Sequence, residues 1–233
     1  MKVAKIESLG MVDGPGIRTI IFTSGCPLRC LYCHNPEMWN ANKSDQDYSV
    51  ETLIATLKRY QAYYETSGGG VTFSGGEPLF QEELIEVLKA CQNEKIHTAI
   101  DTCGHFKDLK TAEEITKNAD LIILDIKHTN YDEYFKLTGQ PMDQLFEYIK
   151  ILNKLNKDIW IRSVIIPNYN DTPDYIKSLT EFVKQINNVT KIELLGYHNL
   201  ADDKYQKLAI NNPLKGTPNM DGLKLKELES LLK

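Results

Sequence analysis

Residues 17–33 read IRTIIFTSGCPLRCLYC, and this stretch joins a predicted strand to a cluster of cysteines. Ile17–Thr23 is rich in β-branched side chains, which favour a strand. Ser24-Gly25 follows it, and three cysteines then occur within eight residues. Sites of α/β proteins lie at the carboxyl ends of their parallel strands. The stretch therefore predicts a functional site directly after the first strand of a parallel sheet.

The alternation of strand and helix continues along the chain. Apolar residues dominate several of the six predicted strands, as expected for a parallel sheet covered by helices. These strands are Ile17–Thr23, Gly70–Phe73, His97–Asp101, Leu121–Ile126, Ile159–Ile166 and Lys191–Leu195. They predict an α/β fold, a partial (β/α)6 barrel of parallel strands with outer helices, formed by residues 1–233 as a single domain. A flat doubly wound sheet is the alternative that periodicity leaves open.

Helical patterns with recognisable ends lie between the strands. Ser49 is a good N-cap for a helix over Val50–Tyr63, and Thr172 is one for Pro173–Gln185, with proline at the first helical position. Gly139 has the position of a glycine cap at a helix end. Further helices are predicted at Gln81–Cys91 and at about Leu223–Leu232.

Five of the six predicted strands are followed by polar or glycine-rich segments. These are Ser24-Gly25-Cys26, Ser74-Gly75-Gly76-Glu77-Pro78, Asp101-Thr102-Cys103-Gly104, Asp125-Ile126-Lys127-His128 and Gly196-Tyr197-His198. Because parallel strands bring their carboxyl ends to one edge, these segments are predicted to meet on a single rim.

Composition places the chain among ordinary globular proteins. A net charge of −5 with scattered basic residues gives no reason to expect nucleic-acid binding. Short basic clusters such as Lys204 to Lys207 are interpreted as solvated faces. No apolar run reaches the roughly 20 residues that a membrane helix needs, and Met1 to Gly10 has no signal-peptide pattern. We therefore expect a cytoplasmic protein that interacts with no nucleic acid and no membrane.

The five cysteines do not form the even, spread set of a secreted disulfide framework. Clustered thiols suggest metal binding or redox chemistry instead. Cys91 fits a buried apolar position inside a helix. A purely structural role is harder to assign to Cys103, because it follows Asp101-Thr102 at a strand end.

Three interpretations are open for the thiols of Cys26, Cys30 and Cys33. A cubane iron–sulfur cluster usually takes four thiolates, so three would leave one iron with an open position for chemistry. A zinc ion could recruit His34 as a fourth ligand, although neighbouring residues rarely reach one tetrahedral ion together. The thiols could also be structural and unligated. The spacing favours the cluster over zinc, and zinc over unligated thiols.

The CxxxCxxC spacing, with Tyr32 before the third cysteine, resembles the signature of the radical S-adenosylmethionine enzymes. Further segments narrow the resemblance to the glycyl-radical-enzyme activating proteins and span most of the chain in the expected order. They are residues 12–18 (VDGPGIR), 26–35 (CPLRCLYCHN), 67–77 (SGGGVTFSGGE), 124–127 (LDIK), 160–162 (WIR) and 197–198 (YH). The family fold is a partial or complete barrel of βα units, compatible with the units predicted above.

The resemblance implies a defined activity. A 4Fe–4S cluster held by Cys26, Cys30 and Cys33 would bind S-adenosyl-L-methionine and cleave it reductively. The resulting 5′-deoxyadenosyl radical would take a hydrogen atom from a backbone glycine of a partner, expected to be pyruvate formate-lyase. Flavodoxin or ferredoxin would supply the electron to a monomeric, oxygen-sensitive enzyme.

The resemblance also assigns roles to residues of this chain. The cluster ligands Cys26, Cys30 and Cys33 carry the catalysis. The residues expected to contact S-adenosylmethionine are Tyr32, Cys33, His34, Gly75, Gly76, Asp125, Ile126, Lys127 and His198. The residues of a monovalent cation site are Asp101, Thr102 and Asp125, with the main chain of Ile123. The residues expected to hold the partner's peptide are Asp13, Pro15, Gly16 and Arg162.

Other functions compete with this one. Activating proteins for other partners often carry a ferredoxin-like insert rich in cysteine, whereas Asn35 to Gly68 contains no cysteine. We therefore expect no such insert. A radical enzyme acting on a small molecule has no need of the Asp13-to-Arg18 motif. A non-catalytic iron–sulfur or zinc protein would need four protein ligands and none of the strand-end residues.

Overall fold

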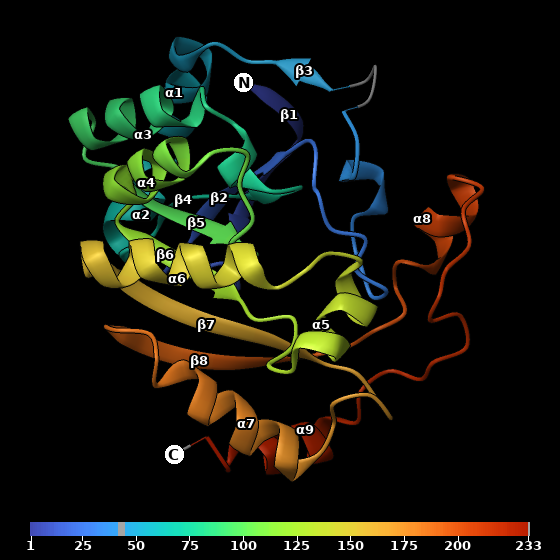
Figure 1. The fold of residues 1–233 in the computed structure, drawn as a ribbon. Coiled ribbons are helices and arrows are strands. Elements are labelled where there is room, and N and C mark those ends of the chain that lie inside the picture. Colours follow the sequence, from blue (N-terminus) through green and yellow to red (C-terminus); the bar gives the residue numbers. More distant parts are fainter. Residues whose placement is uncertain (42–44, 233) are drawn as a thin grey trace.

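Six parallel strands form the centre of the sheet, and each contains or overlaps one predicted strand. They are β2 (Arg18–Thr23), β4 (Gly70–Gly75), β5 (His97–Thr102), β6 (Leu121–Asp125), β7 (Asp158–Ile165) and β8 (Val189–Gly196). The computed structural model describes residues 1–41 and 45–232. Within them the strand order is β3-β1-β2-β4-β5-β6-β7-β8 (Figure 1).

Two antiparallel strands extend one edge of the sheet and were not predicted. β1 (Lys2–Gly10) pairs with β2, and β3 (Gln46–Asp47) pairs with β1. Irregularities interrupt the β1–β2 register between Val3 and Lys5 and between Glu7 and Gly10. Each bulge shifts the side chains to the other face, so the regular alternation that marks a strand in sequence is lost.

The order of the parallel strands decides between the two architectures that the sequence left open. From β2 to β8 the strands follow one another in chain order, with no reversal of the kind that defines a doubly wound sheet. Right-handed crossovers in one direction place their helices on one face. The sheet is therefore the open, partial barrel that was predicted, with helices outside (Figure 1).

The helices agree with the predictions in part. α3 (Leu84–Asn93), α7 (Pro173–Val183) and α9 (Gly222–Glu229) match predicted helices, and Gly139 caps α5 (Tyr131–Thr138) in the left-handed conformation. The helix predicted over Val50–Tyr63 is two helices, α1 (Val50–Lys58) and α2 (Gln61–Ser67). It breaks at Tyr60, which has φ −110° and ψ 4°. The elements that sequence analysis did not predict are α4 (Leu109–Asn118), α6 (Asp143–Leu155), α8 (Asp202–Lys207) and the short 3-10 helices η1 (Pro36–Met38) and η2 (Pro78–Phe80).

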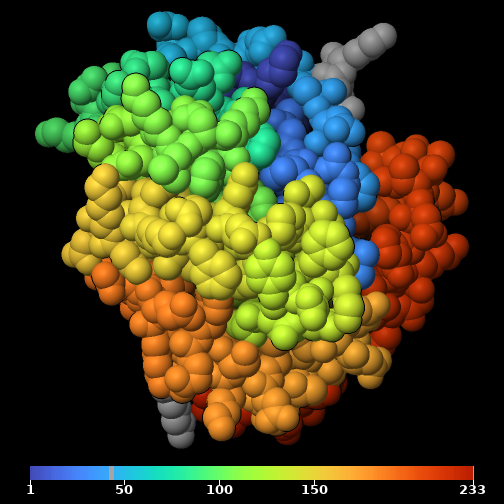
Figure 2. All heavy atoms as spheres, viewed as in Figure 1, coloured from blue at the N-terminus to red at the C-terminus, as the bar shows by residue number. Residues whose placement is uncertain are grey.

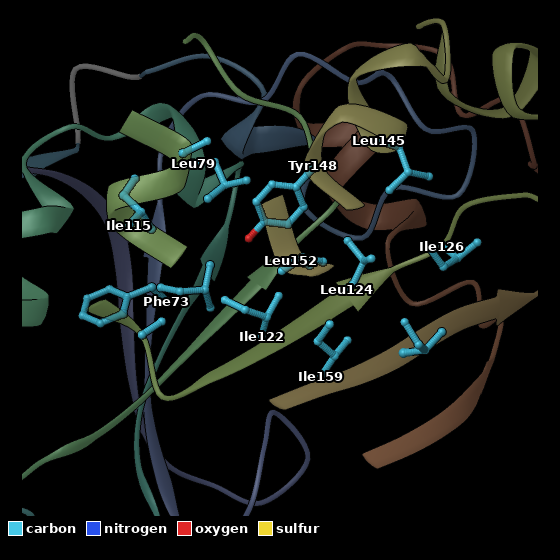
Figure 3. Packing of buried hydrophobic residues seen from close by; sticks show 14 of the residues in the cluster. Phe73, Leu79, Ile115, Ile122, Leu124, Ile126, Leu145, Tyr148, Leu152 and Ile159 are labelled. Carbon is cyan, nitrogen blue, oxygen red and sulfur yellow. The ribbon is translucent and has the colours of Figure 1, made fainter. Parts of the chain in front are cut away.

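The main hydrophobic core lies between the outer helices and the sheet. Figure 3 shows Tyr148 and Leu152 of α6 above Ile122 and Leu124 of β6. The one polar group of Tyr148 is satisfied, because its hydroxyl lies 2.9 Å from that of Thr116. This core fixes the strands and therefore the positions of their carboxyl ends.

The segment that contains α8 returns across the carboxyl end of the barrel. It lies beside the N-terminal part of the chain around η1 (Figures 1 and 2). Residues far apart in sequence therefore come together at the rim predicted to carry function. Within the described ranges, no helix combines the length and apolar character required to span a bilayer.

Arg18 is fully buried at the start of β2. Its guanidinium donates hydrogen bonds to the Thr72 hydroxyl at 2.6 Å, the Val71 carbonyl at 2.5 Å and the Pro15 carbonyl at 3.0 Å. Burial lowers the pKa of Arg18 to about 10. The last residue of the Asp13-to-Arg18 motif is therefore an internal anchor that ties the β1–β2 connection to β4.

We expect the Arg18→Met variant to lose at least about 2 kcal/mol of unfolding free energy, because it leaves buried acceptors without donors. Urea unfolding of the cluster-free protein measures this change. The exposed Arg59 provides the control, since Arg59→Met removes a charge without opening the core. Equal stability of the two variants would contradict the anchoring role.

Candidate functional site

A cavity of about 330 Å³ lies at the carboxyl ends of the parallel strands. Its walls come from the connection after β2 and from the ends of β4, β5, β6, β7 and β8. Its residues include Cys26, Cys30, Tyr32, Cys33, His34, Gly75, Gly76, Glu77, Asp101, Thr102, Cys103, Asp125, Lys127, Arg162, Leu195 and His198. The rim predicted from the strand ends is thus a single concave site.

The three clustered cysteines line this cavity together, and all three are free thiols. Burial raises the pKa of the Cys30 and Cys33 thiols. In contrast, the pKa of Cys26 is lowered, chiefly by the neighbouring side chain of Cys103. Cys26 is therefore the most readily ionised of the three, and Cys103 belongs to the site.

The cysteine loop, residues 24–33, contains no helix or strand, so its backbone is held from outside. The Gly25 and Cys26 amides donate to carbonyls at the end of η1, at 2.9 and 3.1 Å. The amides of Arg29 and Leu31 donate to the last carbonyls of α5, at 2.7 and 2.9 Å. Two elements from different parts of the chain therefore fix the thiols.

Helix α8 supplies a third support, which the sequence analysis missed. The Lys204 ammonium donates to the His34 carbonyl at 2.8 Å, the Asn35 side chain at 2.8 Å and the Glu37 carboxylate at 2.6 Å. The Tyr205 hydroxyl donates to the Cys33 carbonyl at 3.1 Å. Sequence analysis interpreted Lys204 as part of a solvated face. Its side chain is 40% exposed, but it also binds partners about 170 residues away, where no local pattern signals them.

The atoms around Gly75 and Gly76 leave no room for a side chain at either position. A Cβ on Gly75 would lie 2.6 Å from the Thr23 amide nitrogen, and one on Gly76 would lie 2.3 Å from the Gly25 carbonyl oxygen. Gly75 also has φ +102°, a conformation that favours glycine. The pair lets β4 approach β2 and the cysteine loop closely at the cavity wall.

Glu77 is a functional candidate that the sequence analysis left without a role. Its carboxylate accepts hydrogen bonds from the Thr102 hydroxyl at 2.6 Å and from the amide and thiol of Cys103, both at 2.9 Å. The backbone amide of Glu77 donates to the Gly25 carbonyl at 2.8 Å. Burial raises the pKa of Glu77 to about 7. The residue joins β5 to the cysteine loop at the cavity wall.

Buried polar atoms without partners mark the cavity wall. Tyr32 Oη, Asp125 Oδ1 and His198 Nδ1 have no hydrogen-bond partner within the described residues, and all three residues line the cavity. Such atoms are costly unless a ligand or water satisfies them. They indicate a site built for a polar ligand.

Positive and negative groups meet on the same wall. Lys127 forms an ion pair with Asp125 and lies 5.5 Å from the centre of the Tyr32 ring. Burial by itself lowers the pKa of Lys127, but Asp125 and other neighbours outweigh it and raise the pKa well above its usual value. Lys127 is therefore a permanent positive charge at the cavity.

His34 packs against His198 at the cavity wall. Their ring centres lie 3.8 Å apart, and His34 Nε2 lies 3.0 Å from the His198 carbonyl. Burial, followed by His198 and Lys204, lowers the pKa of His34 to about 4. The His34 ring is thus neutral and directed to the backbone of His198.

One predicted cofactor contact lies away from the cavity. Ile126 is fully buried in the main core, as Figure 3 shows. Its amide donates to the backbone carbonyl of Arg162 at 2.8 Å, and its own carbonyl accepts from the Ser163 hydroxyl at 3.0 Å. The structure therefore gives Ile126 a packing role.

The residues predicted for a cation lie near one another, but they have protein partners. Asp101 accepts a hydrogen bond from Ser74 at 2.7 Å and lies 4.0 Å from Arg162. The Thr102 hydroxyl donates to Glu77. Burial, opposed by Arg162 and reinforced by Asp125, raises the pKa of Asp101.

The residues predicted to hold a peptide divide into two groups. Asp13 and Arg162 line the cavity, whereas the Pro15 carbonyl accepts from Arg18 and Gly16 packs on the backbone of Gly69. The Arg162 side chain is only 5% exposed, with Glu193 at 2.9 Å and Asp13 at 3.3 Å. It also donates to the Val12 carbonyl. Arg162 therefore closes the β1–β2 connection against β7.

Comparisons with known proteins identify relatives of this chain. A sequence model described as the radical SAM superfamily matches residues 20–207. The chain is 46% identical over 233 residues to the pyruvate formate-lyase-activating enzyme of Clostridium pasteurianum, which covers 100% of this chain and 97% of the relative. It is 43% identical over 211 residues to the enzyme of that name from Staphylococcus aureus, with 88% and 84% covered.

Solved structures show the same fold. A domain of the pyruvate-formate lyase-activating enzyme from Bacteroides vulgatus aligns with a TM-score of 0.56 and 27% identity, over 71% of this chain and 93% of that chain. Streptococcus suis SuiB bound to S-adenosylmethionine aligns with a TM-score of 0.69 at 20% identity, over 91% of this chain and 45% of that chain. The second likeness concerns the fold alone.

The raised pKa of Glu77 predicts a pH-dependent stability. The folded protein retains a proton that the unfolded chain releases between pH 4.5 and about 7, so stability falls as pH rises through this window. The shift corresponds to about 3 kcal/mol. We expect urea unfolding of the cluster-free Glu77→Gln variant to show a shallower decline than the wild type. Glu82→Gln changes an exposed neighbour and should keep the wild-type slope; parallel slopes in all three proteins would contradict the prediction.

Loss of the Lys204 contacts should loosen the cysteine loop. Because Lys204 is partly exposed, we expect Lys204→Met to cost only about 1 kcal/mol. Hydrogen exchange of the backbone over residues 33–39 should accelerate, and less iron should be retained after reconstitution. The control is Lys207→Met, which changes an exposed lysine of the same helix. If exchange over this segment is the same in both variants, Lys204 does not hold the loop.

Proposed function

Since the chain belongs to the radical SAM superfamily and, within it, to the family of pyruvate formate-lyase-activating enzymes, we propose that it activates pyruvate formate-lyase by generating a glycyl radical in it. The observation that carries the proposal is one cavity that combines the three free thiols of the cysteine loop with unpartnered polar atoms. Identity of 46% over the whole chain to an enzyme of that name supports the partner.

The residues present fit a 4Fe–4S cluster. Cys26, Cys30 and Cys33 would be its protein ligands, since iron–sulfur clusters are bound by thiolates. One iron would receive no ligand from this loop, because the loop carries no further thiol. His34 supports a cluster over zinc, because its ring nitrogen is directed to the His198 carbonyl.

The residues around the cavity also fit S-adenosylmethionine, which offers a carboxylate, an ammonium group and ribose hydroxyls. Lys127 would offset the carboxylate charge, and Asp125 and His198 would bind ribose hydroxyls through their unpartnered atoms. Tyr32, Cys33 and His34 would pack against the adenine. Gly75 and Gly76 would leave room for the methionine end.

When bound, the reduced cluster and S-adenosylmethionine would supply the 5′-deoxyadenosyl radical that removes a hydrogen atom from the partner's glycine. The contribution of the protein is position and exclusion of water. Asp13, Arg162 and Leu195 line the cavity on the side of β7 and β8, where the glycine segment would enter. A direct grip by Arg162 would require it to exchange one of its present partners.

The Asp101 and Asp125 carboxylates, with Thr102, would bind a monovalent cation beside the cofactor. Flavodoxin or ferredoxin would deliver the electron. The enzyme would act as a monomer in the cytoplasm, as a single domain.

Electron paramagnetic resonance tests this function directly. We expect the anaerobically reconstituted and reduced protein to give a cluster signal that S-adenosylmethionine alters, and a glycyl doublet after pyruvate formate-lyase is added. Cys30→Ala should abolish both signals, whereas Cys91→Ala, which removes a thiol from the core of α3, should retain them. A cluster signal that the cofactor leaves unchanged would overturn the proposal. An altered signal without the doublet would show that pyruvate formate-lyase is not the partner.

A further inference from the structure

Arg29 directly precedes the second cysteine of the loop, and its side chain turns back toward the first. Its Nη1 atom donates to the Cys26 carbonyl at 2.7 Å and to the Leu28 carbonyl at 2.8 Å. Its own amide donates to the Thr138 carbonyl of α5 at 2.7 Å. One residue therefore closes the turn between Cys26 and Cys30 and ties this turn to α5.

The guanidinium is also held by the segment that follows η1. Its Nη2 atom lies 3.5 Å from the side-chain oxygen of Asn40, and its central carbon lies 5.1 Å from the centre of the Trp39 ring. The Trp39 carbonyl in turn accepts from the Cys26 amide at 3.1 Å. The amide and the carbonyl of Cys26 are therefore both paired, so the backbone on either side of the first thiol is fixed.

Arg29 is exposed on the outer side of the loop, whereas Cys26 and Cys30 line the cavity. Among the described residues that form the cavity wall, Arg29 is absent, so its side chain is not placed to contact the cofactor. A guanidinium keeps its proton throughout the physiological pH range. A permanent positive charge therefore lies outside the loop whose inner side carries the thiols.

We propose that Arg29 is a positioning residue for the cluster: its guanidinium holds the turn that presents Cys26 and Cys30 to one cluster, and its charge favours the reduced state. The turn has no helix or strand, so its carbonyls need partners from elsewhere, and Arg29 supplies two of these bonds. An added electron makes the cluster and its thiolates more negative, so a cation bound to the Cys26 carbonyl stabilises the reduced form. This inference rests on the proposed function, because it requires the cluster.

Hydrogen exchange of the cluster-free protein tests the holding role without iron. We expect Arg29→Gln to accelerate backbone exchange over residues 26–31 roughly fivefold, because the turn opens more often when its carbonyls lose the guanidinium. Arg59→Gln provides the matched control, since it removes the same charge from an exposed arginine at the end of α1. Exchange over residues 26–31 should be the same in this control as in the wild type.

A redox titration of the reconstituted holoenzymes, followed by electron paramagnetic resonance, tests the effect of the charge. Because Arg29 is exposed, water screens its charge and the expected change is small. At the wild-type midpoint, the ratio of reduced to oxidised cluster should fall about threefold in Arg29→Gln, or about 28 mV for a one-electron couple. Arg59→Gln should leave the ratio unchanged. Arg29→Lys restores a positive charge at the same place and should recover most of the difference.

The outcomes separate the two proposals. A wild-type protein that assembles no cluster overturns the proposed function together with this inference. Unchanged exchange over residues 26–31 in Arg29→Gln, a midpoint potential equal to that of Arg59→Gln, or a lowered potential that Arg29→Lys does not recover overturns the inference alone. Faster exchange with a lowered potential that lysine recovers supports it, as does faster exchange with a cluster that Arg29→Gln loses and Arg29→Lys retains.

Discussion

The site depends on one constraint, which is that the cysteine loop has no secondary structure of its own. Peptide groups removed from water must find partners elsewhere, and here η1, α5 and α8 provide them. The carbonyls at the end of α5 accept from the loop on one side, while Lys204 and Tyr205 hold its far end. Three thiols thereby acquire fixed positions on an irregular segment.

The sheet determines where this loop meets its chemical partners. Strands that follow one another in chain order bring their carboxyl ends to one rim, so Glu77, Asp125 and His198 converge although 121 residues separate the first from the last. Close packing at Gly75 and Gly76 brings β4 against the loop. Glu77 then links β5 to both. The glycines and the buried carboxylate are therefore parts of one wall.

The cavity contains one group that stays charged and one that titrates near neutral pH. Lys127 keeps its proton because Asp125 compensates for burial, whereas burial leaves Glu77 close to its midpoint at neutral pH, with a pKa of about 7. Arg162 is bound to Asp13 and Glu193, which connects the start of the chain to β7. The polar residues of the site thus stabilise the fold of the rim as well as forming a ligand site.

The sequence by itself determined the six parallel strands, the cysteine loop and the rim, because β-branched runs, caps and cysteine spacing are local patterns. It could not reveal β1, whose bulges break the alternation, or the core position of Ile126, which is one residue from the rim. Only the tertiary structure decided the roles of Lys204 and Tyr205. Their contacts join segments as much as 172 residues apart, and such contacts arise from packing between elements, which leaves no periodic trace in the sequence.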